Sequence, residues 1–226
     1  MTGKKGTVPG MQDTSTLRRC ASAHTARSAI AAGFVILLLS ACAAQQPQLN
    51  SERIEARFGS YSVRVLYQDS HWRISSLESA GAGGPITRTL AIVQFAESMA
   101  AELREAHRQI VSGTSIGTTF RDSGWTISKP AVYIGTFELT AKEAAVASLM
   151  TIRLPATVAL HVYDFEVSVG GRQFHYARVA ELHHPQYLAE RDLFDLYGGP
   201  LTTQFDQDVL PTLYAVLHEK ERSLVR

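Results

Sequence analysis

The chain has few of the features from which a function is usually inferred. Of its 226 residues only two are cysteines, and both lie at or before residue 42. The remainder therefore has no thiol for a disulfide, a thiolate metal site or a cysteine nucleophile. The sequence also lacks a Gly-x-Ser-x-Gly elbow, a phosphate-binding loop and a dinucleotide-binding fingerprint. These absences exclude enzymes that are recognised by local motifs, although the members of a Ser-His-Asp triad can be far apart in sequence.

Long apolar runs are also scarce, and the one near the start of the chain is informative. It extends from Ile30 to Leu39, is preceded by Arg18, Arg19 and Arg27, and ends at Ser40-Ala41-Cys42. Positive charge, an apolar stretch and small residues at a cleavage point are the three parts of a signal peptide. A transmembrane helix needs about 20 apolar residues, so the run is too short to be one.

These residues resemble the signal of bacterial lipoproteins. Its lipobox consists of Leu, a small residue, Gly or Ala, and Cys, which Leu39, Ser40, Ala41 and Cys42 match at every position. The resemblance implies that the Cys42 sulfur receives a diacylglycerol, that cleavage falls before Cys42, and that the new amine is acylated with a fatty acid such as palmitate. We therefore expect residues 1–41 to be a signal peptide. A plain secretory signal, with Cys42 as an incidental small residue, is the alternative.

Cleavage would change the charge of the chain. The removed segment has five cationic residues and one acidic residue, so the formal charge falls from +1 to −3 in a mature chain of 185 residues. A weakly acidic chain without a basic run argues against nucleic acid as a partner. We expect residues 42–53 to be a lipidated tether and residues 54–226 to be a single α+β domain in the periplasm.

An internal repeat suggests how that domain is built. Residues 67–75 and 120–128 are identical at five of nine positions, and both contain a Trp. Alternating apolar residues predict a hairpin in each copy, with Tyr67 opposite Trp72 and Phe120 opposite Trp125. Asp69 and Asp122 are interpreted as turn residues and not as a catalytic pair. We therefore expect Trp72 and Trp125 to be buried at equivalent positions of the two hairpins.

The fold class predicted from these patterns is α+β, an antiparallel sheet of hairpins with packed helices. A duplicated β-β-β-α unit (copies at about 60–110 and 113–150) is followed by a third hairpin and C-terminal helices. The remaining predicted strands are Thr89–Phe95, Val132–Phe137, Ala159–Val169 and Gln173–Glu181. Helices are predicted over Ala96–Ile110, over Thr140–Met150, which opens with a capping-box pattern at Thr140 and Glu143, and over Pro185–Tyr197. A last amphipathic helix is outlined by Phe205, Val209, Leu213, Val216 or Leu217, and Leu224.

The third hairpin turns at Gly170-Gly171, a composition typical of a two-residue turn. Pairing Val169 with Arg172 places Glu166 opposite His175 on one face. The other face then has Val167 opposite Phe174 and Phe165 opposite Tyr176.

Three histidines and two carboxylates in this region could suggest a metal site: His175, His183, His184, Glu166 and Glu181. Adjacent residues of an extended segment point to opposite sides, so His183 and His184 cannot easily share one ion. No His-x-x-x-His or His-Glu-x-x-His motif is present. The prediction is therefore a surface ion pair and a helix start at Pro185, with no metal, cofactor or catalytic residue assigned.

The function expected from the sequence is that of a membrane-anchored envelope lipoprotein. It would act as a non-catalytic accessory, scaffolding or binding subunit for another envelope protein. The alternatives are a small periplasmic hydrolase that uses His183 or His184, and a carrier for a small apolar ligand.

The lipid anchor can be tested directly. Cys42→Ser should remain uncleaved or become soluble, and should not be labelled by a palmitate analogue, because the acylated sulfur is gone. Undiminished labelling of this variant would contradict the lipoprotein interpretation. The residue after the cysteine is Ala43 and not an aspartate. In a cell with two membranes, this predicts that the protein fractionates with the outer membrane.

Overall fold

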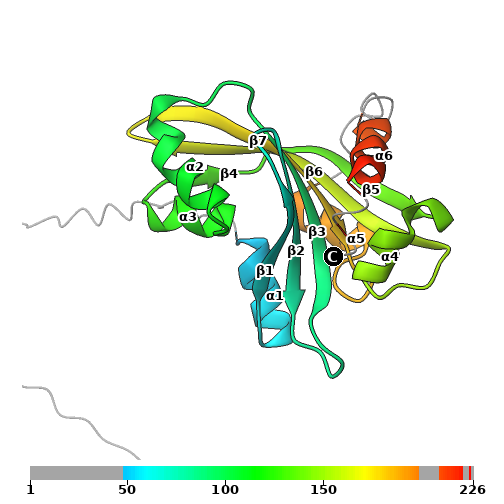
Figure 1. Cartoon of the computed structure of the whole chain (residues 1–226). Helices are drawn as coiled ribbons and strands as arrows, with labels where there is room; N and C mark the ends of the chain where they lie inside the picture. Colours follow the sequence, from blue (N-terminus) through cyan, green and yellow to red (C-terminus); the bar gives the residue numbers. More distant parts are fainter. Residues whose placement is uncertain (1–47, 199–208, 221–223, 225–226) are drawn as a thin grey trace, which may run out of the picture. The chain divides into compact units, whose positions relative to one another are not determined.

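The computed structural model describes residues 48–198, 209–220 and 224. A seven-stranded antiparallel sheet with helices packed against it confirms the predicted α+β class (Figure 1). Cys42 and the expected signal peptide lie outside the described residues, as does Phe205.

Helices and strands are interspersed along the chain. The strands are β1 (Ser62–Gln68), β2 (Trp72–Ser79), β3 (Ile86–Phe95), β4 (Thr126–Ser128), β5 (Ala131–Leu139), β6 (Ala156–Val169) and β7 (Arg172–His183). The helices are α1 (Asn50–Phe58), α2 (Arg104–Val111), α3 (Ile116–Asp122), α4 (Ala144–Leu149), α5 (Glu190–Tyr197) and α6 (Val209–Glu219). Short 3-10 turns at Ala101–Leu103 and Ala141–Glu143 lead into α2 and α4. No helix in the described part of the chain is long and apolar enough to cross a bilayer.

The order of the strands in the sheet is β1-β2-β3-β7-β6-β4. The long strand β6 pairs with β7 along most of its length, and it also pairs with both β4 and β5. Because β7 occupies one edge of β6, β4 and β5 share the other edge. The strands β3, β7 and β6 are thus central and bring distant parts of the sequence together.

The alternation of side chains divides the core between the two faces of the sheet. In β7, Ala180 and Leu182 belong to an apolar cluster that includes residues of α4 and α6. Ala177 and Val179 belong to a second cluster, which contains residues of α2 and α3. A third cluster, with Ile54 of α1, lies beneath α1 and α5 on that second face. Successive residues of a strand point to opposite faces, so α4 and α6 cover one face and the other four helices cover the opposite one.

Local sequence explains several of these elements. Thr140 and Glu143 form the predicted capping box: the Thr140 backbone N–H donates to Glu143 Oε2 at 2.8 Å, and Thr140 Oγ1 accepts from the Lys142 N–H at 3.2 Å. Gly170 and Gly171 have φ of 57° and 76°, as a two-residue hairpin turn requires.

The folded part begins earlier than the sequence suggested. The first helix starts at Asn50 and not near Ile54, and Leu49 and Asn50 are buried. The Leu49 N–H donates to Glu52 Oε2 at 2.9 Å, which satisfies one of the backbone donors left free at a helix start. The segment between Cys42 and the domain is therefore shorter than the predicted tether.

The first hairpin is confirmed, with a different register. Its loop is Asp69–His71, and Tyr67 pairs with Ile74 where the prediction placed Trp72. Farther from the turn, the register changes again at an irregularity between Val65 and Tyr67. The turn role of Asp69 is confirmed, since its Oδ1 accepts from the N–H groups of His71 and Trp72 at 2.7 Å each.

The second copy of the repeat is not a hairpin. Phe120 lies in α3 and not in a strand, so it does not pair with Trp125 across a ladder. Its ring is fully buried and lies 4.8 Å from the Tyr176 ring and 5.8 Å from the Trp125 ring, centroid to centroid. Ile116 and Phe120 are four residues apart, which also suits one face of a helix. Packing of Phe120 into this aromatic group outweighs the strand pattern.

The third hairpin has the predicted pairs next to its turn and a β-bulge beyond them. Val169 pairs with Arg172 and Glu166 pairs with His175, as expected. Phe165, however, pairs with Ala177 and not with Tyr176, because β7 has one extra residue at this point. The expected Glu166–His175 ion pair is replaced by a hydrogen bond of 2.6 Å from Gln173 Nε2 to Glu166.

The C-terminal helices agree in part with the sequence. The helix expected from Pro185 begins only at Glu190, after a turn in which the Tyr187 N–H donates to the His184 carbonyl at 2.7 Å. In α6, Leu213, Val216 and Leu217 are buried against the sheet, as the amphipathic pattern predicted.

The two tryptophans are predicted to differ in their contribution to stability. Trp125 is buried among aromatic rings, whereas Trp72 is only partly buried beside the core. Trp125→Ala should reduce the free energy of unfolding by about 3–5 kcal/mol, the range for a buried aromatic residue, and Trp72→Ala by clearly less. Urea unfolding of the two variants measures this difference. Equal losses would show that the two sites are equivalent after all.

Candidate functional site

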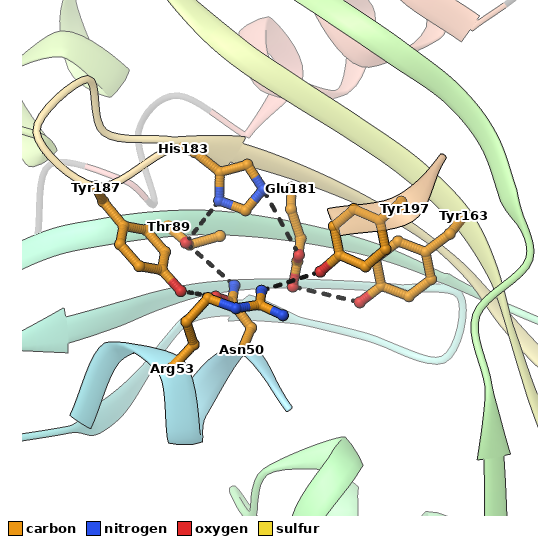
Figure 2. A network of polar contacts seen from close by, with 8 residues as sticks. All are labelled: Asn50, Arg53, Thr89, Tyr163, Glu181, His183, Tyr187 and Tyr197. Carbon is orange, nitrogen blue, oxygen red and sulfur yellow. Dashed lines mark hydrogen bonds and ion pairs between the residues drawn. The ribbon is translucent and has the colours of Figure 1, made fainter. Parts of the chain in front are cut away.

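A cluster of polar side chains lies buried between the sheet and the helices α1 and α5. Figure 2 shows residues of this cluster, which come from separate parts of the chain. They are Asn50 and Arg53 of α1, Thr89 of β3, Tyr163 of β6, Glu181 and His183 of β7, Tyr187 of the turn after β7, and Tyr197 at the end of α5; His161 of β6 completes the cluster.

The sheet register brings the central members together. His161 pairs directly with Glu181 across β6 and β7, and Thr89 pairs with His183 across β3 and β7. Residues directly opposite each other share a face, and residues two apart on one strand do so as well. All four side chains therefore point to the face that α1 covers.

Hydrogen bonds connect the outer part of the cluster. Asn50 Nδ2 donates to Thr89 Oγ1 at 3.2 Å, and the Tyr187 hydroxyl donates to Asn50 Oδ1 at 2.5 Å. Thr89 Oγ1 in turn lies 3.0 Å from His183 Nδ1. The α1 side chains are thus bonded to the sheet and to the turn after β7.

Four atoms at the centre of the cluster have no hydrogen-bond partner among the described residues. They are both ring nitrogens of His161, Nε2 of His183 and Oε2 of Glu181. His161 and His183 are fully buried and Glu181 is 4% exposed. Most buried polar atoms in proteins have a partner, so this concentration of unpartnered atoms is unusual.

Other contacts hold these three side chains in place. The Tyr163 hydroxyl donates to Glu181 Oε1 at 3.3 Å, which leaves Oε2 free. The His161 ring stacks on the Tyr197 ring with centroids 4.0 Å apart and an interplanar angle of 25°. The nearest approach between His183 Nε2 and Glu181 Oε2 is 3.8 Å, which is longer than a hydrogen bond.

Burial keeps both histidines uncharged. It lowers the pKa of His161 and of His183 to about 3, and the nearby cations Lys129 and Arg53 act in the same direction. Glu181 acts in the opposite direction on His161. Both imidazoles are therefore neutral near pH 7, each with a lone pair on one ring nitrogen.

A small cavity adjoins the cluster beneath α1. It has a volume of about 70 Å³ and shares Glu181 with the cluster. Its polar lining includes Arg73, Ser75 and Lys129, and its apolar lining includes Val93 and Val179. A single water occupies about 30 Å³ in the liquid, so the cavity has room for a few waters or for a ligand of a few atoms.

The cations near the cavity differ in how they are held. Arg73 is fully buried, and its guanidinium donates to the Ile110 carbonyl at 2.6 Å and to Ser75 Oγ at 2.9 Å. Lys129, in the loop between β4 and β5, has its ammonium 5.1 Å from the centre of the Tyr163 ring. Burial lowers the pKa of Lys129, whereas Glu181 acts to raise it.

The structure separates the histidines that the sequence grouped together. His183 and Glu181 lie in the cluster, whereas His175 and Glu166 lie near the hairpin turn, where His175 is exposed. The side chain of His184 is bonded locally, with Nδ1 accepting from the Gln186 N–H at 3.0 Å. The sequence argument that His183 and His184 point to opposite sides agrees with this arrangement.

Sequence reasoning missed His161. Its strand was predicted, but counting back from the Gly170-Gly171 turn without a bulge pairs it with Ala180 and not with Glu181. Alternation along β6 already places His161 on the face of Phe165, but that Glu181 and His183 share this face could have been found only by locating the extra residue at Tyr176.

Comparisons with known proteins give little guidance. No protein-family model matches the chain, and none of the curated proteins is similar to it. A solved structure that matches is the crystal structure of the PhnF C-terminal domain, with a TM-score of 0.37 and 12% sequence identity, over 62% of this chain and 77% of that chain.

The buried histidines predict a loss of stability in mild acid. Because their folded pKa lies below the value of 6.5 for free histidine, the unfolded chain takes up protons first. The free energy of unfolding should have its full value above about pH 6.5. It should fall toward pH 3, on the order of 1 kcal/mol per pH unit for each histidine. His161→Phe should flatten this dependence in urea unfolding between pH 7 and pH 5 in buffer with EDTA. The same pH dependence in both proteins would show that His161 is not held neutral.

Proposed function

We propose that this chain is a bacterial envelope lipoprotein, anchored through lipids on Cys42, that acts as a non-catalytic binding or accessory subunit. The observation that carries the proposal is the lipobox Leu39-Ser40-Ala41-Cys42, which ends an apolar run. Its partner would be another protein of the envelope, most simply in the outer membrane, and the domain would face the periplasm.

The position of the first helix supports a role close to the membrane. Leu49, the first buried apolar residue of the part that the structure describes, follows Cys42 by only seven positions. Seven residues can span at most about 25 Å. Two acyl chains give stable anchoring where one gives marginal binding, so the domain would remain within this distance of the bilayer. Such confinement raises its effective concentration for a membrane-bound partner.

The cavity beneath α1 does not have the lining of a serine hydrolase site. Its lining contains serines but, among the described residues, no histidine or aspartate that could complete a Ser-His-Asp triad. Arg73, its most deeply buried cation, already donates two hydrogen bonds within the domain.

The size of the same cavity argues against a carrier of apolar molecules at this position. Pockets for drug-sized ligands occupy about 300–1,000 Å³, whereas the cavity beneath α1 has about 70 Å³. An acyl chain or a similar ligand would not fit there without displacement of α1.

Release of the domain from the membrane tests the proposal. In a strain with the gene deleted, we expect the anchored protein to restore envelope function and to crosslink to an envelope protein. A form with a cleavable, non-lipidated secretory signal should do neither at equal abundance, because it is no longer concentrated at the bilayer.

The control for this experiment is the fold. Both forms should unfold at the same temperature, which would show that only the anchor differs. Full complementation by the soluble form would contradict the proposal and would favour an enzyme that acts on diffusible substrates.

A further inference from the structure

The geometry points to a binding site for a divalent transition-metal cation such as Zn²⁺, with His161, Glu181 and His183 as its protein ligands. The ligand atoms of these three buried side chains lie within 4.8 Å of one another. The inference depends on the described domain alone, so it stands or falls independently of the lipid anchor.

The ligand set is chemically suitable. Two imidazoles and one carboxylate are a known three-residue set for zinc, with a fourth position left for water or a ligand. Neutral imidazole and ionised carboxylate are the forms that bind metal, and the histidines of this cluster are held neutral by burial.

The unpartnered atoms are the ones that a cation would use. His161 has both ring nitrogens free, and His183 Nε2 and Glu181 Oε2 are free as well. These atoms belong to side chains that are at least nine-tenths buried. A tetrahedral zinc with bonds of about 2.0–2.1 Å places its ligand atoms roughly 3.4 Å apart. The three side chains would therefore have to move inward only slightly.

Neighbouring groups are placed to orient the ligands. If the Nδ1–H of His183 donates to Thr89 Oγ1, 3.0 Å away, Nε2 has the lone pair that a metal needs. The Tyr163 hydroxyl holds the other oxygen of Glu181. Second hydrogen bonds of this kind fix the ring orientation and the tautomer in metal sites.

The adjoining cavity supplies space for the fourth ligand. Glu181 lines both the cavity and the cluster, so a water or a small anion in the cavity could reach an ion bound there. Lys129 also lines the cavity and would repel a dication. Arg53, whose guanidinium donates to the Tyr197 hydroxyl at 3.1 Å, would repel the ion as well, and it cannot lose its proton. Lys129 is therefore the cation that can move away or lose its proton.

Calorimetric titration of Zn²⁺ into the untagged full-length protein, extracted in detergent and treated with EDTA, tests the site. The wild type should bind one Zn²⁺ per chain. His161→Phe removes the ligand but keeps a ring to stack on Tyr197, and it should weaken binding by more than about tenfold, since even second-sphere changes cost 10–100-fold. His175→Phe is the matched control, because His175 is an exposed histidine of β7, and it should bind like the wild type.

Two further variants test the surroundings. Thr89→Val keeps the shape of the side chain but cannot bond His183 Nδ1, and it should weaken binding by about 10–100-fold. Lys129→Met removes the opposing charge and should lower the dissociation constant. A merely structural cluster would not show these opposite changes.

The result that would overturn the inference is equal affinity of the wild type and His161→Phe, or less than one Zn²⁺ bound per wild-type chain. Should His161→Phe fail to fold in EDTA, as judged by far-UV circular dichroism, Co²⁺ bound to the wild type decides. Visible absorption bands of a four- or five-coordinate Co²⁺ would support the site, and the spectrum of six-coordinate aqueous Co²⁺ would refute it.

Discussion

The β-bulge at Tyr176 is the constraint on which the buried polar cluster depends. One extra residue in β7 reverses the faces to which all later side chains of that strand point. With the bulge, Glu181 lies opposite His161 on the face that α1 covers. Without it, Ala180 would take this place, and the carboxylate would lie among the apolar side chains beneath α4 and α6.

The polar cluster that results lowers the free energy of unfolding. It also connects the proposed membrane-anchored lipoprotein with the proposed cation site. A buried polar group without a hydrogen-bond partner destabilises a protein by about 1–3 kcal/mol, and natural proteins depart from good polar pairing mainly at functional sites. The helix that covers the cluster is α1, which contributes Asn50 and Arg53 and is also the first element that the structure describes after Cys42. In the proposed lipoprotein, the part of the domain next to the membrane anchor would therefore also close the cation site.

Much of the fold could be predicted because its signals are local. The capping box that begins at Thr140 and the turn at Gly170-Gly171 are each determined by a few adjacent residues. Phe120 was assigned to a strand because it repeats the sequence around Tyr67, but its burial against distant aromatic rings produces a helix instead. The cluster was missed for a related reason, since the faces of Glu181 and His183 depend on the bulge at Tyr176, and no sequence pattern near it revealed the extra residue.

The central claim is that the bulge places His161, Glu181 and His183 around one cation position. A crystal structure of the zinc-treated protein, with diffraction recorded on both sides of the zinc absorption edge, tests it most directly. The account predicts an anomalous peak at about 2.0–2.2 Å from a ring nitrogen of each histidine and from the Glu181 carboxylate. A structure in which His161 lies opposite Ala180, with Glu181 on the other face of the sheet, would contradict it.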